Sequence, residues 1–345
     1  MSMLRALFSF AFGVFSSAAG AQEVNEPLPA DNGGYEVLAN LFGRTELLRY
    51  VKVGNEAIMG GDIILGTHSE MQTANAINLL RLIAEADVGQ MEDQTVAEYA
   101  GRLQSELPAD MRPFAAVDKQ TTVWPGTEIP YLFGSSITED DSTLRELIES
   151  AVQQWNDSQD RIELVAAEDT AEEAVLFEKP SGTKRLCQAS LGYTEGQSTS
   201  VKVNDKCEKG SIVHEIGHAL GLMHEHQRPD RSTYIDPVDW AKEGNNYAVA
   251  PTQYQTAYDL CSIMHYHPLQ KPDDSPAGEW FTLTEAGQKS FDACKGDLPT
   301  ENGCQEVGQR CVLSSVDLSA VAELYPGVKG ESKETGEGTV ADAPK

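Results

Sequence analysis

Positive charge is scarce in this sequence of 345 residues, which has 26 lysine and arginine residues against 54 aspartate and glutamate residues. The formal net charge of -28 argues against nucleic acid and anionic membranes as partners, because both bind basic surfaces. The chain also lacks an apolar run of about 20 residues, the length that a transmembrane helix needs. We therefore expect no nucleic-acid partner and no membrane-spanning segment.

Cysteine is absent from the first 186 residues, and the six cysteines that follow include no Cys-x-x-Cys pair. That absence argues against a zinc site built from thiolates. In an exported chain, six cysteines instead predict disulfide bonds, because the compartment is oxidising. They form a group of two and a group of four: Cys187 and Cys207, then Cys261, Cys294, Cys304 and Cys311.

The N-terminus has the pattern of an export signal. Residues 1–5 carry one positive charge, residues 6–15 are mostly apolar, and residues 19–21 read Ala-Gly-Ala, a small-x-small cleavage pattern. A membrane anchor is the alternative, but it would need a longer apolar segment. We predict a signal peptide over residues 1–21 and a secreted, extracellular protein.

The segment 22–114 differs from the rest of the chain. Its residues 74–107 carry apolar side chains at a helical spacing, whereas residues 54–66 include the pair Gly60-Gly61, which interrupts regular structure. We expect this segment to be mainly helical, with a loop at residues 54–66.

Residues 115–327 have the pattern of a mixed α+β domain. A strand pattern over residues 121–133 precedes apolar residues at helical spacing over residues 144–155, and short strand patterns follow. This order predicts helices packed on a sheet. Residues 328–345 form an acidic tail that has almost no apolar side chains, so we expect it to be disordered.

The run SIVHEIGHALGLMHEH, residues 211–226, carries the chemistry of the chain. His214 and His218 are four residues apart, so a helix would present both imidazoles on one face. Gly221 tolerates the left-handed conformation that ends a helix, and a turn there can bring His224 back as a third ligand.

Three neutral histidines predict a tetrahedral Zn²⁺ site whose fourth position stays open for water, the arrangement of a catalytic zinc. Glu215 is close enough to reach that water without binding the metal, and we expect it to act as the general base of a hydrolysis. Chance produces H-E-x-x-H in about one chain per hundred, and the longer pattern roughly a thousandfold less often. His68 is expected to be a surface residue, and the other three histidines are expected to be solvated or structural: His226, His265 and His267.

The extended motif H-E-x-x-H-x-x-G-x-x-H resembles that of the metzincin zinc endopeptidases, in which a Met-turn follows; here that segment is SIMHY, residues 262–266. Glu225, the RPDR run at residues 228–231 and the tyrosine of SIMHY resemble the astacin family in particular. Residues 124–131 and 308–325 are similar to that family's first strand and closing helix.

The resemblance implies a fold of two subdomains, with the zinc helix at the floor of a cleft between them. It implies a secreted zinc endopeptidase that is made as a zymogen, binds one Zn²⁺ per subunit and cleaves protein or peptide substrates; a monomer is favoured. The segment 22–114 would then be a propeptide, and residues 115–327 the catalytic domain.

The same resemblance assigns roles to single residues. It implies that His214, His218 and His224 bind zinc and that Glu215 is the general base. Tyr266 would be a fifth, detachable ligand that donates a hydrogen bond to the oxyanion of the tetrahedral intermediate.

Three further residues follow from the resemblance. Met264 would form an apolar base beneath the metal. Glu225 would receive the amino terminus of the mature chain, which the family's spacing places at Ala115. Asp62, in the sequence MGGD at residues 59–62, would occupy the water position in the zymogen and block the metal.

The resemblance also implies a disulfide between Cys187 and Cys207. The family's usual long-range disulfide has no counterpart, because no cysteine lies between Ala115 and Cys187. The last four cysteines allow three pairings; we favour Cys261 with Cys311 and Cys294 with Cys304.

Two other functions stay open. A catalytically silent binding protein on the same fold would commonly have lost a ligand or the general base, and this chain keeps all of them. A structural module held by zinc would need four protein ligands.

Overall fold

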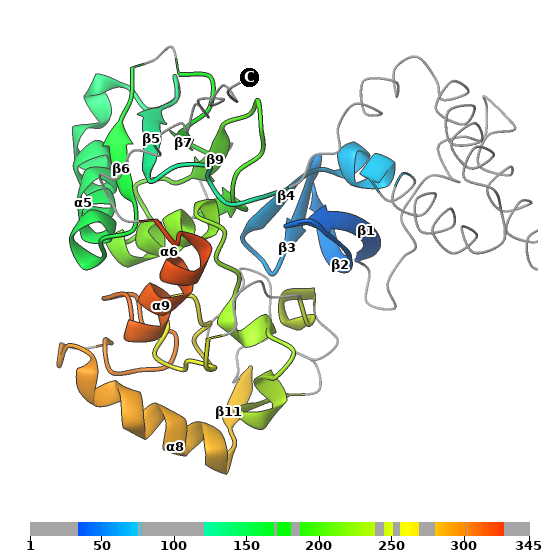
Figure 1. Cartoon of the computed structure of the whole chain (residues 1–345), viewed down its shortest axis with the longest axis vertical. Coiled ribbons are helices and arrows are strands. Elements are labelled where there is room, and N and C mark those ends of the chain that lie inside the picture. The colour runs from blue at the N-terminus through cyan, green and yellow to red at the C-terminus, as the bar shows by residue number, and fades with distance from the viewer. Residues whose placement is uncertain are drawn as a thin grey trace, which may run out of the picture.

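Figure 1 shows the computed structural model, which describes residues 34–74, 77, 121–168, 171–180, 187–238, 245–250, 256–268, 280–301 and 303–327. The expected signal peptide, the expected mature terminus at Ala115 and the expected acidic tail lie outside the described residues. In the part of the chain that is described, no helix combines the length and apolar character needed to span a bilayer.

The largest element is a sheet of nine strands in the order β1-β2-β3-β4-β8-β9-β7-β5-β6. Four strands come from the N-terminal segment: β1 (Tyr35–Leu41), β2 (Arg44–Val53), β3 (Glu56–Met59) and β4 (Ile63–Thr67). Five come from the following domain: β5 (Glu128–Phe133), β6 (Glu163–Ala166), β7 (Val175–Glu178), β8 (Gln188–Ser190) and β9 (Thr199–Lys202). The two groups meet where β4 pairs in parallel with β8, through Ile63 with Ala189 and Ile64 with Ser190.

The expectation of a mainly helical N-terminal segment is wrong for residues 35–67, which form β1 to β4 (blue in Figure 1). Val37, Ala39 and Leu41 alternate along β1 and are all buried, the period of a strand that covers a core. Gly60 and Gly61 have φ angles of 64° and 100°, so this pair makes the turn between β3 and β4. Of the expected helix at residues 74–107, only residues 74 and 77 are described; both are helical.

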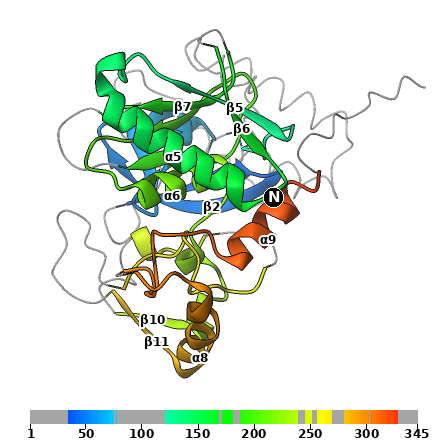
Figure 2. The ribbon, with the colours of Figure 1, turned by 90° about the vertical axis from the view of Figure 1, so that its left-hand side faces the viewer.

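Two helices pack side by side against the sheet, α5 (Ser142–Ser158) and α6 (Lys209–Ala219), as Figures 1 and 2 show. The predicted apolar stripe of α5 is buried in the main core, and Trp155 donates from Nε1 to the backbone oxygen of Val213 in α6 at 2.9 Å. The mixed α+β fold predicted for this region is confirmed. The helix α6 is thus held between α5 and the strands β8 and β9.

The rest of the chain forms a second part that lies below the sheet in Figure 1 and has its own core around Ile235, Tyr247 and Phe281. Its helix and strands are β10 (Ile235–Pro237), β11 (Phe281–Leu283) and α8 (Glu285–Cys294). Short 3₁₀ helices complete the domain: η2 (Glu139–Asp141), η3 (Glu225–Gln227), η4 (Arg231–Thr233), η5 (Asn245–Tyr247) and η6 (Lys295–Asp297).

The last helix, α9 (Ser315–Leu324), begins with a capping box formed by Ser314 and Asp317. Its Ala320 and Val321 belong to the main core, so α9 connects the second part of the chain back to the sheet. Asp317 also accepts hydrogen bonds from the hydroxyl of Ser262 and the backbone of Ile263, at 2.5 and 3.0 Å. The closing helix therefore positions the SIMHY segment.

All six cysteines form disulfides, and the predicted pair Cys187–Cys207 is among them. The pairing favoured for the last four is wrong, because the structure joins Cys261 to Cys294 and Cys304 to Cys311. Cys294 ends α8 and is thereby brought beside Cys261, with a Cα separation of 6.2 Å that suits a disulfide. The position of Cys294 at the end of α8 therefore sets this proximity.

Candidate metal centre and active site

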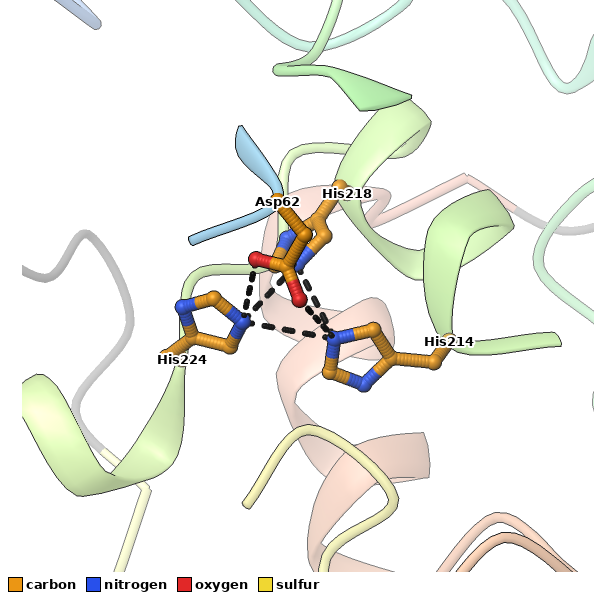
Figure 3. A group of neighbouring side chains, drawn as sticks. All are labelled: Asp62, His214, His218 and His224. Atoms are coloured by element: carbon orange, nitrogen blue, oxygen red, sulfur yellow. Dashed lines mark hydrogen bonds and ion pairs between the residues drawn. The ribbon is translucent and has the colours of Figure 1, made fainter. Parts of the chain in front are cut away.

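Three histidine rings meet at one point, and α6 and the turn after it put them there. His214 and His218 project from the same face of α6, which ends at Ala219. Gly221 then adopts a φ of 101°, and the chain returns to bring His224 beside them. The three Nε2 atoms are 3.1 to 3.3 Å apart, and all three side chains are buried (Figure 3).

The hydrogen bonds of the other ring nitrogens define the tautomers. The Nδ1 atoms of His214 and His218 lie 2.8 and 2.7 Å from the backbone oxygens of Ile263 and Leu222. A carbonyl oxygen can only accept, so both Nδ1 atoms carry the proton and both Nε2 atoms carry a lone pair. Burial also lowers the pKa of His214 to about 4 and that of His218 well below its usual value. Both rings are therefore neutral, and each presents a lone pair on Nε2.

This geometry fits a Zn²⁺ ion. Nitrogen ligands at about 2.0–2.1 Å in a tetrahedron would lie about 3.3 Å apart, close to the observed spacing. Lone pairs that face one another at 3.1 to 3.3 Å repel unless a cation lies between them. The donor set of neutral imidazoles is also the one that zinc prefers.

Asp62 supplies the fourth group and points into the centre of the three rings (Figure 3). Its Oδ1 lies 2.9 Å from Nε2 of His224, and its Oδ2 lies 3.6 Å from Nε2 of His214. Oδ1 accepts no hydrogen bond from any described residue. A carboxylate oxygen facing three imidazole lone pairs is the arrangement expected when a metal ion binds all four.

The turn that carries Asp62 tolerates only glycine. A Cβ on Gly60 would lie 2.7 Å from Oε1 of Gln227, and one on Gly61 would lie 2.8 Å from the hydroxyl of Tyr266. Positive φ angles at both positions add to this requirement. The MGGD sequence therefore brings the backbone into contact with the site.

Glu215 follows the first ligand and is almost fully buried at 2% exposure. Its Oε2 has no hydrogen-bond partner among the described residues. Burial raises its pKa well above the usual value, and the charge of Asp62 raises it further. An unpartnered carboxyl oxygen with a raised pKa is suited to accept a proton from water.

The SIMHY segment passes beneath and beside the three histidines. A Cβ on Gly217 would lie 2.6 Å from Sδ of Met264, so the methionine packs directly under α6. The hydroxyl of Tyr266 donates to the backbone oxygen of Gly60 and lies 3.2 Å from Oδ2 of Asp62. Its pKa is raised well above the usual value by burial, and further by the charge of Asp62, so it stays a donor.

Glu225 is buried, and its Oε1 accepts from Nη1 of Arg228 at 3.1 Å and from the backbone of Asp259 at 2.8 Å. Burial raises its pKa to about 8, although the charge of Arg228 acts in the opposite direction. The pairing with Ala115 remains a prediction, because Ala115 lies outside the described residues.

The other histidines are structural. The expectation that His68 is a surface residue is wrong, because it is 4% exposed and hydrogen bonds to Tyr50 at 2.9 Å. His226 is buried and stacks on Tyr266 with a ring-centroid distance of 4.0 Å. His265 is also buried, and Nε2 of His267 lies within hydrogen-bond distance of Oε2 of Glu306, at 3.0 Å.

Sequence reasoning missed two side chains that support the site. Oε1 of Gln227 lies 2.9 Å from Nδ1 of His224. Arg310 donates to the backbone oxygens of Ile263 and His265 at 2.7 and 3.1 Å, which holds the SIMHY segment in place. Gln227 lies three residues after His224, within reach in a helical turn, so its position in the sequence could have indicated the contact.

Comparisons with known proteins identify the family of this chain. The family model described as Astacin, a family of peptidases, matches residues 116–326. Zinc metalloproteinase nas-4 of Caenorhabditis elegans is 29% identical over 220 residues, which cover 61% of this chain and 61% of the relative. Nematocyst expressed protein 6 of Nematostella vectensis is 32% identical over 224 residues, which cover 61% of this chain and 68% of the relative.

Among solved structures, the chain is similar to high choriolytic enzyme 1, a hatching enzyme zinc-protease from Oryzias latipes. The TM-score is 0.45 at 24% identity, and the match covers 59% of this chain and 94% of the other. The family model alone covers well over half of the sequence. This chain therefore belongs to the astacin family of peptidases.

Proposed function

We propose that this protein is a secreted zinc-dependent endopeptidase, made as a zymogen, that hydrolyses internal bonds of protein or peptide substrates. The observation that carries the proposal is the convergence of three histidine Nε2 atoms 3.1 to 3.3 Å apart, next to Glu215, whose Oε2 has no hydrogen-bond partner among the described residues. Secretion is supported by the signal pattern of residues 1–21.

His214, His218 and His224 would hold one Zn²⁺, which supplies Lewis-acid polarisation of the substrate carbonyl and lowers the pKa of a nearby water. Glu215 would take the proton from that water and return it to the leaving amine. The hydroxyl of Tyr266, kept protonated by its raised pKa, would donate to the oxyanion. Met264 would keep the underside of the metal site apolar and rigid.

The N-terminal segment would act as the inhibitor. Asp62 would occupy the position that water needs, and its backbone oxygen accepts from Ala189 of β8 at 3.0 Å. An extended substrate would bind by pairing with an exposed strand edge, and β4 covers the edge of β8. The N-terminal segment would thus block both the metal position and the strand edge with which a substrate would pair.

The alternatives fit less well. A catalytically silent binding protein has no need of a general base, an oxyanion donor or an inhibitory carboxylate, whereas this chain has Glu215, Tyr266 and Asp62, with the hydroxyl of Tyr266 3.2 Å from Oδ2 of Asp62. A structural zinc would need a permanent fourth ligand, whereas Asp62 belongs to a segment that the domain boundary at Ala115 would release.

A cleavage assay on the full chain tests the proposal. A recognition sequence for a site-specific protease is placed immediately before Ala115, the chain is cut, and hydrolysis of an unstructured protein is measured. We expect activity only after the cut, and none with Glu215→Ala or with a chelator. A cut, folded and zinc-loaded chain that hydrolyses nothing would favour the silent binding protein.

A further inference from the structure

We propose that Gln227 is a positioning residue that sets the tautomer and the ring orientation of His224, and through them the affinity of the site for Zn²⁺. This inference rests on the ligand set proposed above and concerns a side chain that does not touch the metal position. It follows from how the three ligand rings are held.

The three rings differ in what holds their second nitrogen. His214 and His218 donate from Nδ1 to backbone oxygens, which no side-chain substitution can remove. His224 instead donates to a side chain, Oε1 of Gln227, at 2.9 Å. It is therefore the one ligand whose orientation depends on the identity of another residue.

The amide of Gln227 can point only one way. Its Nε2 lies 3.2 Å from the backbone oxygen of Ala248, which accepts but cannot donate. The NH₂ group must face Ala248, so the amide oxygen faces His224 and Nδ1 must carry the proton. The lone pair of His224 is then on Nε2, facing the other two ligands.

The position of Gln227 is itself fixed. Its backbone nitrogen donates to His224 at 3.3 Å within η3, and its backbone oxygen accepts from Ala250 at 2.8 Å. The side chain is 1% exposed, so water cannot readily replace it as the acceptor. The amide joins the third ligand to the segment of residues 245–250.

His224 needs this contact more than the other ligands do. His214 and His218 are placed by α6, whereas His224 lies in the turn before η3, outside any helix. Without the acceptor, Nδ1 would be a buried donor with no partner, and moving the proton to Nε2 would aim it at the metal position. Loss of such a supporting contact typically weakens metal binding by about 10- to 100-fold.

The test measures Zn²⁺ affinity of the full chain by competition with a chromophoric chelator. Gln227→Met keeps the size of the side chain and removes the acceptor, and we expect binding weaker by about 10- to 100-fold. Gln227→Glu keeps an acceptor oxygen for His224 but places its second oxygen against that of Ala248, so we expect an affinity between those of the wild type and Gln227→Met. His214→Ala is the reference for loss of a ligand.

A matched control separates positioning from general destabilisation. Gln159, at the end of α5, also makes several amide hydrogen bonds. Its Nε2 donates to the backbone oxygens of Trp155 and Ile162, and its Oε1 accepts from the backbone nitrogen of Ile162. Gln159→Met should lower the unfolding temperature of the metal-free chain without changing its Zn²⁺ affinity. Gln227→Met should change the affinity beyond any effect on that temperature.

The proposal falls if Gln227→Met binds Zn²⁺ as the wild type does, or if Gln227→Glu is as weak as Gln227→Met. In either case, a loss of Zn²⁺ binding in His214→Ala would still support the proposed ligand set. If Gln227→Met does not fold, NMR of the zinc-loaded wild type decides. An Nδ1 proton of His224 that is protected from exchange supports the role of Gln227, and a rapidly exchanging one refutes it. A wild-type chain that binds no Zn²⁺ overturns both the ligand set and this inference.

Discussion

Replacement of Asp62 by alanine should give the uncut chain measurable peptidase activity without fully activating it. The carboxylate lies 2.9 Å from Nε2 of His224 and 3.2 Å from the hydroxyl of Tyr266. A hydrogen bond to a charged group, such as that from Tyr266 to Asp62, contributes about 1.5–3 kcal/mol, and each 1.4 kcal/mol or so changes an equilibrium tenfold. The fraction of molecules with an open site should therefore rise by about 10- to 100-fold.

The activity of uncut Asp62→Ala should remain below that of the cut enzyme, because other contacts of the N-terminal segment remain. β4 stays paired with β8, and Met59 and Ile63 stay packed in a buried apolar cluster with Leu191 and Met223. The assay compares hydrolysis of a peptide by uncut Asp62→Ala, uncut wild type and the cut forms of both.

A control for this prediction uses another carboxylate of the same segment. Glu56 in β3 forms an ion pair with Lys202 of β9, away from the histidines. Partly exposed ion pairs contribute little, so uncut Glu56→Ala should stay inactive. The reasoning is refuted if uncut Asp62→Ala is as silent as the wild type while its cut form is active.

Three further predictions concern catalysis, covalent links and acid stability. In the cut chain, Glu215→Gln should lower peptide hydrolysis by about 100- to 10,000-fold while the zinc content measured by atomic absorption stays at one per chain; a loss of zinc would contradict its role as a base. Replacing both Cys261 and Cys294 by serine opens a loop with a sequence separation of 33 and should lower the free energy of unfolding in urea by about 3–4 kcal/mol, whereas no change would argue against that disulfide. The free energy of unfolding of the metal-free chain should fall as the pH is lowered from 6.5 to about 4. Burial lowers the pKa of folded His214 to about 4, so over this interval the residue takes up a proton in the unfolded chain but not in the folded one. Urea unfolding of His214→Gln should show a flatter dependence over that interval, and an unchanged slope would refute the assignment.

The local parts of the site could be predicted from the sequence. His214 and His218 share a face because they are one helical turn apart, and Gly221 signals the turn that returns His224. These relations involve neighbours within ten residues. The capping box at Ser314 is equally local, and the structure contains it.

The N-terminal segment could not be predicted in the same way. β4 pairs with β8 across more than 120 residues, and several short strands of similar composition could have paired otherwise. Val37, Ala39 and Leu41 alternate along β1, but so short an alternation is a weaker signal than the longer helical pattern of residues 74–107. His68 was misplaced for this reason, since it is buried against Tyr50 of β2.

The C-terminal disulfides show a different limit. Which of the last four cysteines pair depends on the direction in which α8 leaves β11, and this direction is set by packing around Phe281 and Phe291. Spacing along the chain carries no information about that. Gln227 was missed for a simpler reason, because it orients a proposed ligand without being part of the metal-binding motif.

X-ray absorption at the zinc edge of the uncut chain would detect the proposed metal and its ligands directly. We expect one Zn²⁺ per chain with three nitrogen ligands at about 2.0–2.1 Å and one oxygen at about 2.0–2.2 Å. In His224→Ala, one of the three nitrogen contributions should disappear. A sulfur ligand near 2.3 Å, or a folded chain that takes up no zinc, would contradict the account.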